Sequence, residues 1–435
     1  MLFLQSSTQT TTFPLTFFDI LWLKVYPVER VFFYTLPSSQ SHPSFFFQKL
    51  VTILKSSPSL TLKHFLPLAG KIIWPSESQQ PIILYTPNDG VSLLIAESKV
   101  DFDQVVENSP DEASLSRSFI PHLESADSFA SIISVQITLF QKSGFSIRTS
   151  THHGVLDGKS STMFIKAWAY LCNKTIETNE ESPTLLAKLE PLFNMEIIKD
   201  PNELGVTFKN SYSVRATFNL TLEDLIKIKQ MVSSKLEVVD KNESNLKPQS
   251  LSAFVLTCAY SLVCLAKAIH GAAKEKDKFS FAFPIDCRSR LEPPIPNNYF
   301  GNCVWGHFVD TKPSNFMEED DVYLVAKCIH EKIKMINDHG VFQGSINDGF
   351  GKYNSLINEG FGVFGVGGSN KFGVYETDFG WGKPEKVVTV SVDRGLYIGL
   401  AESKDGNGGV EVELVLNKLV MDLFSSFFFE GLCIN

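Results

Sequence analysis

Seven residues, His152-His153-Gly154-Val155-Leu156-Asp157-Gly158, most constrain the fold of this chain. They follow a strand-like hairpin over residues 135–150 and precede an apolar-faced segment that predicts a helix over residues 160–172. Each glycine in a helix interior costs about 1 kcal/mol relative to alanine, which disfavours a helix through Gly154 and Gly158. We therefore predict a strand–turn–helix unit whose tight turn presents His153.

The turn carries groups that can move protons. A histidine with an ordinary pKa of about 6.5 is the usual general base at neutral pH, and Asp157 could hold the turn that presents His153. From spacing alone, a general base and a purely structural histidine pair both remain open. A metal site built from His152, His153 and Asp157 is weaker, because no further ligand is suggested nearby and zinc normally takes at least three protein ligands. We predict no metal.

Other motifs are absent or incomplete. The segment from Gly154 to Ser160 has three residues between its glycines where a phosphate-binding loop needs four. The GxGxxG pattern from Gly360 to Gly365 follows a helix-like stretch instead of a strand, which argues against a dinucleotide site. No GxSxG elbow occurs, which weakens a serine hydrolase hypothesis.

Length and charge narrow the class further. The chain has 435 residues, above the roughly 250–300 at which one hydrophobic core stops growing, so we expect two domains. Its net charge of −9 argues against nucleic acid as a main partner. The seven cysteines are odd in number and form no CxxC pair, which favours reduced thiols in a cytoplasmic protein.

The N-terminal region gives no targeting signal. Residues 1–12 lack the basic start and small-residue cleavage site of a signal peptide. The apolar stretch 13–25 is too short and too polar to span a bilayer, so we expect no membrane association.

Strand-like and helix-like segments alternate along the chain, which predicts an α/β architecture. The expected strands cover residues 12–23, 31–36, 82–85, 91–96, 279–286, 387–392 and 410–416. The expected helices cover residues 43–56, ended by Ser56-Ser57-Pro58, then 222–232, and 252–268, which is apolar on nearly every side and therefore central.

Three motifs together carry a family resemblance. They are HxxxD from His153 to Asp157, Tyr299-Phe300-Gly301-Asn302-Cys303, and Asp378-Phe379-Gly380-Trp381-Gly382. With them the sequence resembles the plant BAHD acyltransferases, which esterify natural products with acyl-CoA. The similarity covers nearly the whole chain, and the second motif resembles the branch that acylates anthocyanins and other phenolic glucosides.

The resemblance implies a fold. Two chloramphenicol-acetyltransferase-like domains with mixed sheets would flank a solvent channel, with CoA entering from one face and the acceptor from the other. Residues 1–190 would form the N-terminal domain, 191–213 a crossover linker shorter than is usual in the family, and 214–435 the C-terminal domain. We expect a monomer.

The resemblance also implies roles for His153 and for the residues around it. His153 would be the general base, and Asp157 would support it from a salt bridge instead of completing a triad. By motif match, the partners of Asp157 would be Arg288 and Asn302. Asp157 would thereby clamp the histidine turn to the second domain.

Four further residues receive roles. Asp378 and Trp381 would be structural, and Ser369, after Gly367-Gly368, is a candidate donor to the oxyanion. Ser252 matches a region near CoA in the family, although it equally suits a plain helix N-cap.

The implied reaction needs no resident cofactor. Acyl-CoA would be the co-substrate, malonyl-CoA being favoured over a hydroxycinnamoyl-CoA, and the acceptor would be a sugar hydroxyl of a phenolic glycoside. An inactive family member that only binds phenolic glycosides or CoA remains the alternative.

Overall fold

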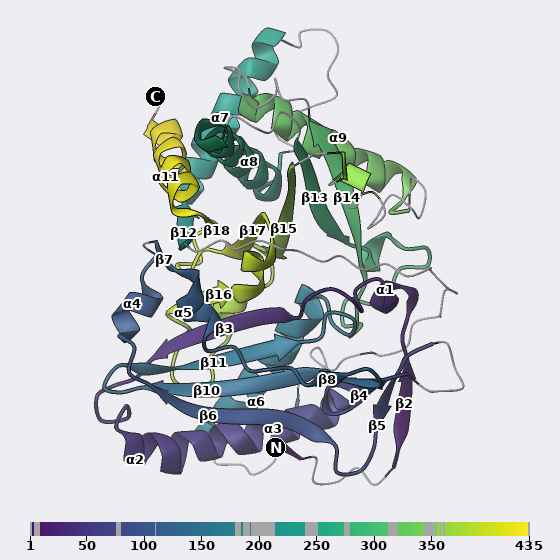
Figure 1. The fold of residues 1–435 in the computed structure, drawn as a ribbon, viewed down its shortest axis with the longest axis vertical. Helices are drawn as coiled ribbons and strands as arrows, with labels where there is room; N and C mark the ends of the chain where they lie inside the picture. Colours follow the sequence, from purple (N-terminus) through teal and green to yellow (C-terminus); the bar gives the residue numbers. More distant parts are fainter. Residues whose placement is uncertain are drawn as a thin grey trace.

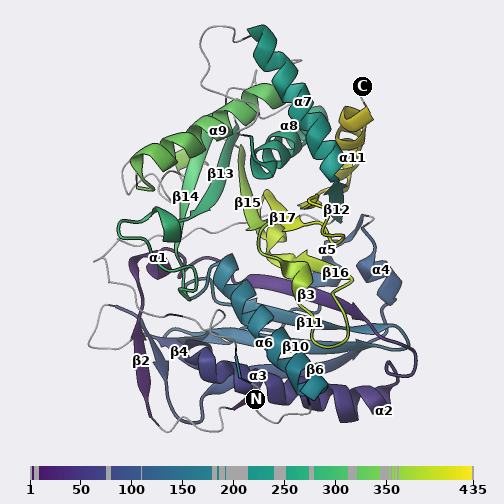
Figure 2. The same ribbon diagram turned by 180° about the vertical axis from the view of Figure 1, so that it is seen from behind.

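The computed structural model describes residues 2–3, 9–74, 80–108, 110–178, 184–185, 192, 214–239, 251–273, 279–311, 321–342, 352, 355–356, 358–359 and 362–433. Figures 1 and 2 show two layered regions, one formed largely by the first half of the chain and one by the second. Sheets with both parallel and antiparallel pairs are combined with helices in the two regions, so the predicted α/β class is confirmed.

A six-stranded sheet forms the main layer of the first region. Its spatial order is β1 (Leu2–Phe3), β6 (Gly90–Ser98), β10 (Ile133–Phe140), β11 (Gly144–Thr151), β3 (Val28–Thr35) and β16 (Lys386–Thr389). The predicted hairpin is confirmed, because β10 and β11 pair antiparallel with Phe140 opposite Gly144. Strand β11 is buried along its length and ends directly before the two histidines.

Two long helices, α3 (Val51–His64) and α6 (Gly158–Thr178), cover one face of this sheet (Figures 1 and 2). They pack against each other through Trp168, whose indole Nε1 donates to Ser57 Oγ at 3.0 Å. The sheet and the helices bury one apolar core of the molecule, which includes Phe32, Ile147 and Leu171.

The helix expected to stop at residues 56–58 instead continues to His64. It starts as α2 (Pro43–Phe45), passes through a π-helical turn (Phe46–Leu50) and runs on as α3. Pro58 lacks the N–H that a helix interior uses, yet Ser57 and Pro58 are buried, and the Ser57 hydroxyl donates to Ile53 O at 2.9 Å. The expected end was wrong because packing against α6 outweighs the local effect of proline.

A seven-stranded sheet forms the second region. Its order is β14 (Val304–Thr311), β13 (Phe279–Asp286), β15 (Gly362–Ser369), β17 (Tyr397–Glu402), β18 (Val410–Leu416), β12 (Val214–Leu220) and β7 (Asp111–Glu112). Its helices are α7 (Leu222–Val239), α8 (Ala253–Ala273), α9 (Asp321–His339) and α11 (Lys418–Cys433). As predicted, α8 is a core helix, with Cys258, Leu262 and Leu265 fully buried.

By length and composition alone, Ala253–Gly271 of α8 could cross a membrane, but 72% of the apolar window is buried inside the protein. A buried core helix of this composition passes the same test.

A smaller five-stranded sheet has the order β2 (Thr11–Pro14), β5 (Ile82–Tyr85), β4 (Lys71–Ile73), β9 (Phe129–Ser131) and β8 (Ser125–Ala126). Short helices among the described residues include α1 (Phe17–Ile20), α4 (Phe102–Val106) and α5 (Ala113–Arg117). The strands expected over 82–85 and 91–96 are both present, but they belong to different sheets.

Two expected strands were only partly right. The strand over 12–23 is β2 followed by α1, because Thr16 and Asp19 form a reciprocal capping box that starts a helix. The strand over 387–392 ends at Thr389 in β16, and a 3-10 turn (Val390–Arg394) follows. At this point the buried guanidinium of Arg215 donates hydrogen bonds to the carbonyl oxygens of Thr389 and Val390, at 3.3 and 3.0 Å.

Segments of each half pack in the other region. Strand β16 extends the first sheet by pairing with β3, and β7 extends the second by pairing with β12. Phe17 and Phe18 of α1 pack in the hydrophobic core of the second region, which is called the second core below. The expected linker 191–213 lies outside the described residues except for Leu192, whose backbone N–H donates to Asn298 O at 2.9 Å.

Candidate active site

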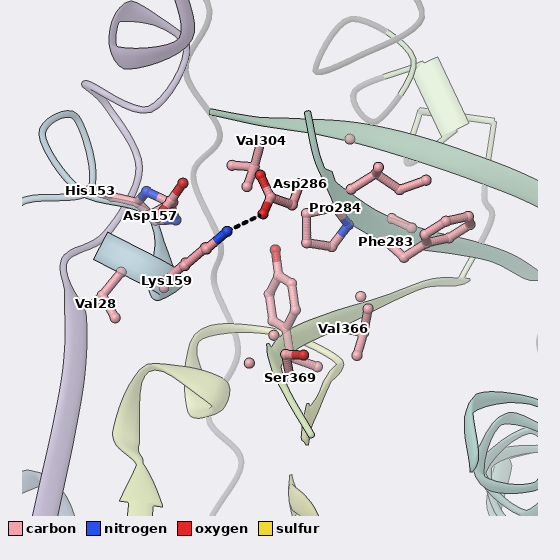
Figure 3. Close-up of a pocket in the computed structure, with 18 of the residues that line it drawn as sticks. Val28, His153, Asp157, Lys159, Phe283, Pro284, Asp286, Val304, Val366 and Ser369 are labelled. Carbon is pink, nitrogen blue, oxygen red and sulfur yellow. Dashed lines mark hydrogen bonds and ion pairs between the residues drawn. The ribbon is translucent and has the colours of Figure 1, made fainter. Parts of the chain in front are cut away.

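The turn after β11 takes the shape that its glycines predict. Its first hydrogen bonds are local, since His152 Nδ1 accepts from the Gly154 N–H at 3.1 Å and His152 O accepts from Val155 N at 3.0 Å. A Cβ on Gly154 would lie 2.8 Å from Leu23 Cδ2 and 3.1 Å from Leu23 Cα, so a larger residue here would force the segment after α1 to shift. His153 follows His152 in the chain and is one of the residues that line the pocket drawn in Figure 3.

Asp157 ends the turn and starts α6. Its Oδ1 accepts from the Ser160 N–H at 2.8 Å, so it is the N-cap of that helix. Its Oδ2 lies 2.8 Å from Arg288 Nη2 and accepts from the Cys303 N–H at 3.1 Å. Because the side chains of Asp157 and Arg288 are 1% and 0% exposed, the predicted salt bridge is confirmed as a buried contact between the two halves.

Arg288 is held on several sides. Besides Asp157 it pairs with Asp286 Oδ1 at 3.0 Å and donates to Gly301 O at 3.0 Å. Burial alone would lower the pKa of Arg288, but the carboxylates of Asp157 and Asp286 outweigh it and raise that pKa. The guanidinium therefore stays charged and fixes the loop before Cys303 against α6.

Asn302 was expected to bond Asp157, and that partner was wrong. Its side-chain Nδ2 donates instead to the backbone carbonyl of His153 at 2.8 Å and to Asp19 Oδ1 at 3.0 Å. The neighbouring N–H of Cys303, not the amide of Asn302, reaches Asp157. Asn302 thus fixes the backbone of His153, and the carboxylate of Asp19 on α1 orients the side-chain amide of Asn302.

Asp19 and Trp22 are site residues that sequence reasoning missed. Burial raises the pKa of Asp19 to about 6, although it accepts hydrogen bonds from Thr16 and Asn302. The Trp22 ring stacks on the His153 imidazole at 4.2 Å with an angle of 8°. The Thr16-x-x-Asp19 capping pattern could have revealed the helix that positions both residues.

The environment of His153 favours the neutral ring. Burial lowers the pKa of His153, and its own carbonyl, Asp157 and Asn302 offset only part of that effect. Burial, assisted by His153, also lowers the pKa of His152 to about 4. Nδ1 of His153 is buried, so Nε2 is the candidate ring nitrogen to accept a substrate proton from the space that His153 lines.

That space is a cavity of about 500 Å³ between the two regions. His153 and Lys159 line it from the first half, and Phe283, Asp286 and Val366 line it from the second (Figure 3). Lys159 Nζ pairs with Asp286 Oδ2 at 2.9 Å, so an ion pair joins α6 to β13 at the cavity wall. Burial would raise the pKa of Asp286, but Arg288 and Lys159 outweigh it and lower that pKa.

Two other expected site residues line the same cavity. Ser369 ends β15, and its Oγ accepts from the Lys371 N–H at 3.2 Å (Figure 3). Ser252 Oγ accepts from the Val255 N–H at 3.3 Å, so the N-cap interpretation is confirmed for α8. Both hydroxyl oxygens are acceptors in these contacts, and their roles toward substrate stay predictions.

Asp378 and Trp381 lie away from the lining of this cavity. Asp378 Oδ1 accepts from the N–H groups of Gly380 and Gly382, at 2.7 and 3.0 Å, and so closes its own turn. The Trp381 ring meets Phe145 edge-on at 5.8 Å, while the buried Phe379 enters the first core. These contacts are structural, as expected.

No group of three or more His, Cys, Asp or Glu is placed to hold a metal ion within the part of the chain that the structure describes. The site is instead an imidazole and an ion pair facing a mostly apolar cavity that two regions share. Such a site suits proton transfer between bound organic substrates.

Comparison with known proteins defines the class. A family model described as the Transferase family matches residues 1–430. Phenolic glucoside malonyltransferase 1 of Arabidopsis thaliana is 38% identical, with 98% of this chain and 94% of that protein covered. The malonyl-CoA:anthocyanidin 5-O-glucoside-6''-O-malonyltransferase of the same plant is 35% identical, with 98% and 96% covered.

The fold comparison agrees. The crystal structure of vinorine synthase superposes with a TM-score of 0.72 at 20% identity, covering 97% of this chain and 95% of that one. The chain therefore belongs to the BAHD acyltransferase family, with the two-domain, chloramphenicol-acetyltransferase-like architecture that its motifs predicted.

Proposed function

We propose that this protein transfers an acyl group, malonyl by preference, from CoA to a sugar hydroxyl of a phenolic glucoside. The observation that carries the proposal is His153, whose ring faces the cavity between the two regions while its backbone is fixed by Asn302. The names of the malonyltransferase relatives support the donor and the acceptor class.

His153 is the general base in this proposal. A hydroxyl is a weak nucleophile until its proton is removed, and a neutral imidazole within hydrogen-bond reach can remove it. Burial lowers the pKa of His153, so the ring is neutral at pH 7 and ready to accept. The Trp22 ring stacked on the imidazole limits its rotation and can stabilise the imidazolium that forms.

The reaction then proceeds without a covalent enzyme intermediate. The hydroxyl oxygen attacks the thioester carbonyl as its proton passes to His153, and a tetrahedral oxyanion forms. Ser369 is the proposed donor to that oxyanion. When the C–S bond breaks, the CoA sulfur takes the proton back from the imidazolium, giving the ester and free CoA thiol. One cavity that holds both substrates supplies their orientation.

The test follows free thiol. Purified protein is mixed with malonyl-CoA or coumaroyl-CoA and a flavonoid glucoside, and thiol release is compared between wild type and His153→Ala. We expect release with malonyl-CoA, loss of at least about 100-fold in kcat on substitution because general-base catalysis contributes about 10²–10⁴-fold, and an unchanged melting temperature. His153→Ala with near-normal kcat would contradict the mechanism.

The same assay decides between the alternatives. Release with coumaroyl-CoA alone would assign hydroxycinnamoyl transfer. No release with either donor, together with glucoside binding by calorimetry, would favour a family member that binds without turnover.

Three wider properties belong to the same proposal. We propose a monomer with a domain division near residues 191–213 that works in the cytoplasm. All seven cysteines are free and five are buried, which supports a reducing compartment.

A further inference from the structure

Arg30 is a buried cation in the cavity wall. It lies on β3, is 3% exposed and lines the same cavity as His153. Its Nη1 donates to Thr162 Oγ1 at 2.7 Å, and its Nε is buried without a hydrogen-bond partner. Among the residues that the structure describes, no carboxylate lies within 4.0 Å of the Arg30 guanidinium.

The other buried arginine of this cavity, Arg288, is compensated by two carboxylates. A buried charge without a counter-ion is destabilising, and Arg30 lines a cavity from which a ligand can supply the opposite charge. Burial lowers the pKa of Arg30 to about 10, with Glu402 acting in the opposite direction, so the group is still protonated at pH 7. At pH 7 the Arg30 guanidinium is therefore positively charged, and no carboxylate of the described residues contacts it.

Arg30 also lies near the reacting centre. Strand β3 is the neighbour of β11, and Arg30 pairs with Thr149, two residues before the end of β11. Because Thr149 is three residues before His152, the backbone of Arg30 is roughly 10 Å along the strand direction from the start of the histidine turn, at about 3.3 Å per residue. Thr162, which accepts from Arg30, lies one helical turn after the start of α6, the helix that Asp157 caps.

We propose that Arg30 binds the free carboxylate of a dicarboxylic acyl donor, malonyl-CoA being the smallest suitable one. This inference rests on the proposed acyl transfer and assigns its donor selectivity to one residue. A guanidinium matches a carboxylate with two parallel hydrogen bonds, and in a buried site the pair is strong because little water competes. An acyl group without a carboxylate would leave Arg30 uncompensated.

The phosphates of CoA are a poorer match for Arg30. Phosphates carry several charges and remain partly hydrated, which suits the exposed cations Arg290 and Lys371 that line the same cavity. Arg30, at 3% exposure, suits a small anion that enters the cavity with the acyl chain.

The experiment compares malonyl-CoA with acetyl-CoA, which lacks only the carboxylate. In Arg30→Gln, an amide can keep the contact with Thr162 while the charge is removed. We expect kcat/KM for malonyl-CoA to fall about 10- to 100-fold, the range for a lost hydrogen bond to a charged group, while acetyl-CoA changes by less than about twofold. Arg30→Lys should recover part of the malonyl selectivity, because lysine keeps the positive charge but cannot form the two parallel hydrogen bonds of a guanidinium.

Arg290→Gln is the matched control, because it removes another arginine from the same cavity. It should change the two donors by the same factor. Equal loss of both donors, or of free CoA binding, in Arg30→Gln would overturn the inference and assign Arg30 to the phosphates. Melting temperatures of the variants exclude a folding effect.

Failure of the proposed function gives a different result. Wild type that releases thiol only from coumaroyl-CoA would overturn the carboxylate site while leaving acyl transfer in place. If no donor releases thiol, calorimetry tests the carboxylate site directly. Tighter binding of malonyl-CoA than of acetyl-CoA by wild type, by at least about tenfold, with loss of that difference in Arg30→Gln, would support the site. Equal binding of the two donors by wild type would overturn it.

Discussion

At the scale of single residues, the proposed role of His153 as general base predicts how activity depends on pH. The base must be neutral, and burial lowers the pKa of His153 below its usual value of about 6.5. Activity is therefore full at pH 7 and falls only as the pH drops through this lowered pKa. We expect kcat/KM for the proposed reaction to show an acid limb with its midpoint below about 6.5. A midpoint above pH 7, measured by thiol release in buffers of constant ionic strength, would contradict the neutral buried ring.

Individual residues also show what the sequence could reveal of the site. The family resemblance, and not the HxxxD spacing, predicted that Arg288 pairs with Asp157, as it does. The motif by itself left the role of His153 as a base open. It could not place Asn302 on the carbonyl of His153, because that contact depends on α1, where Asp19 turns the amide. Arg30 and Trp22 lie more than a hundred residues before His153, so only strand order and packing bring them to the cavity.

At the scale of elements, the sequence predicted those whose local pattern and packing agree. The β10–β11 hairpin has alternating apolar residues and a turn at Lys142, and α8 is apolar all round because it is surrounded by the second core. The failures are elements whose ends are set by distant groups. Helix α3 continues past Pro58 because it packs on α6. Strand β16 ends at Thr389, where the Arg215 guanidinium donates hydrogen bonds to the carbonyls of Thr389 and Val390.

The contact between α3 and α6 gives an element-scale prediction. Ser57 Oγ accepts from Trp168 Nε1 and is fully buried, so Ser57→Ala leaves the indole N–H unsatisfied. We expect the free energy of unfolding to fall by about 1–3 kcal/mol. Ser56→Ala is the matched control, because Ser56 makes the same hydroxyl bond to Ile53 O on the exposed side of α3 and should change stability by less than about 0.5 kcal/mol. Equal urea midpoints for the two variants would contradict the role assigned to the Trp168 bond.

At the scale of the whole molecule, the two halves are joined by exchanged segments and by polar contacts at the cavity. Strand β16 completes the first sheet, β7 completes the second, and α1 packs in the second core while Asp19 reaches the loop of Asn302. The Arg288–Asp157 and Lys159–Asp286 pairs also link the start of α6 in the first half to residues of the second half. The position of His153 therefore depends on the relative position of both halves.

The salt bridge between Asp157 and Arg288 is where this dependence can be measured. Asp157→Ala removes one carboxylate from a fully buried guanidinium, and breaking one side of such a pair costs about 3–5 kcal/mol. It also removes the N-cap of α6, worth about 1 kcal/mol. We expect a lower urea midpoint together with a loss of kcat, because the turn that carries His153 is no longer fixed to the second half.

Asp286→Ala is the control for that substitution, since Asp286 also pairs with Arg288 but is 37% exposed. Water can replace part of its contribution, so its loss should lower stability by less than the loss of Asp157 does. If Asp157→Ala unfolded at the wild-type urea concentration, the buried pair would contribute little to joining the halves. The position of His153 would then have to be set by Asn302 and Trp22 alone, which hold the same turn through its backbone carbonyl and its ring.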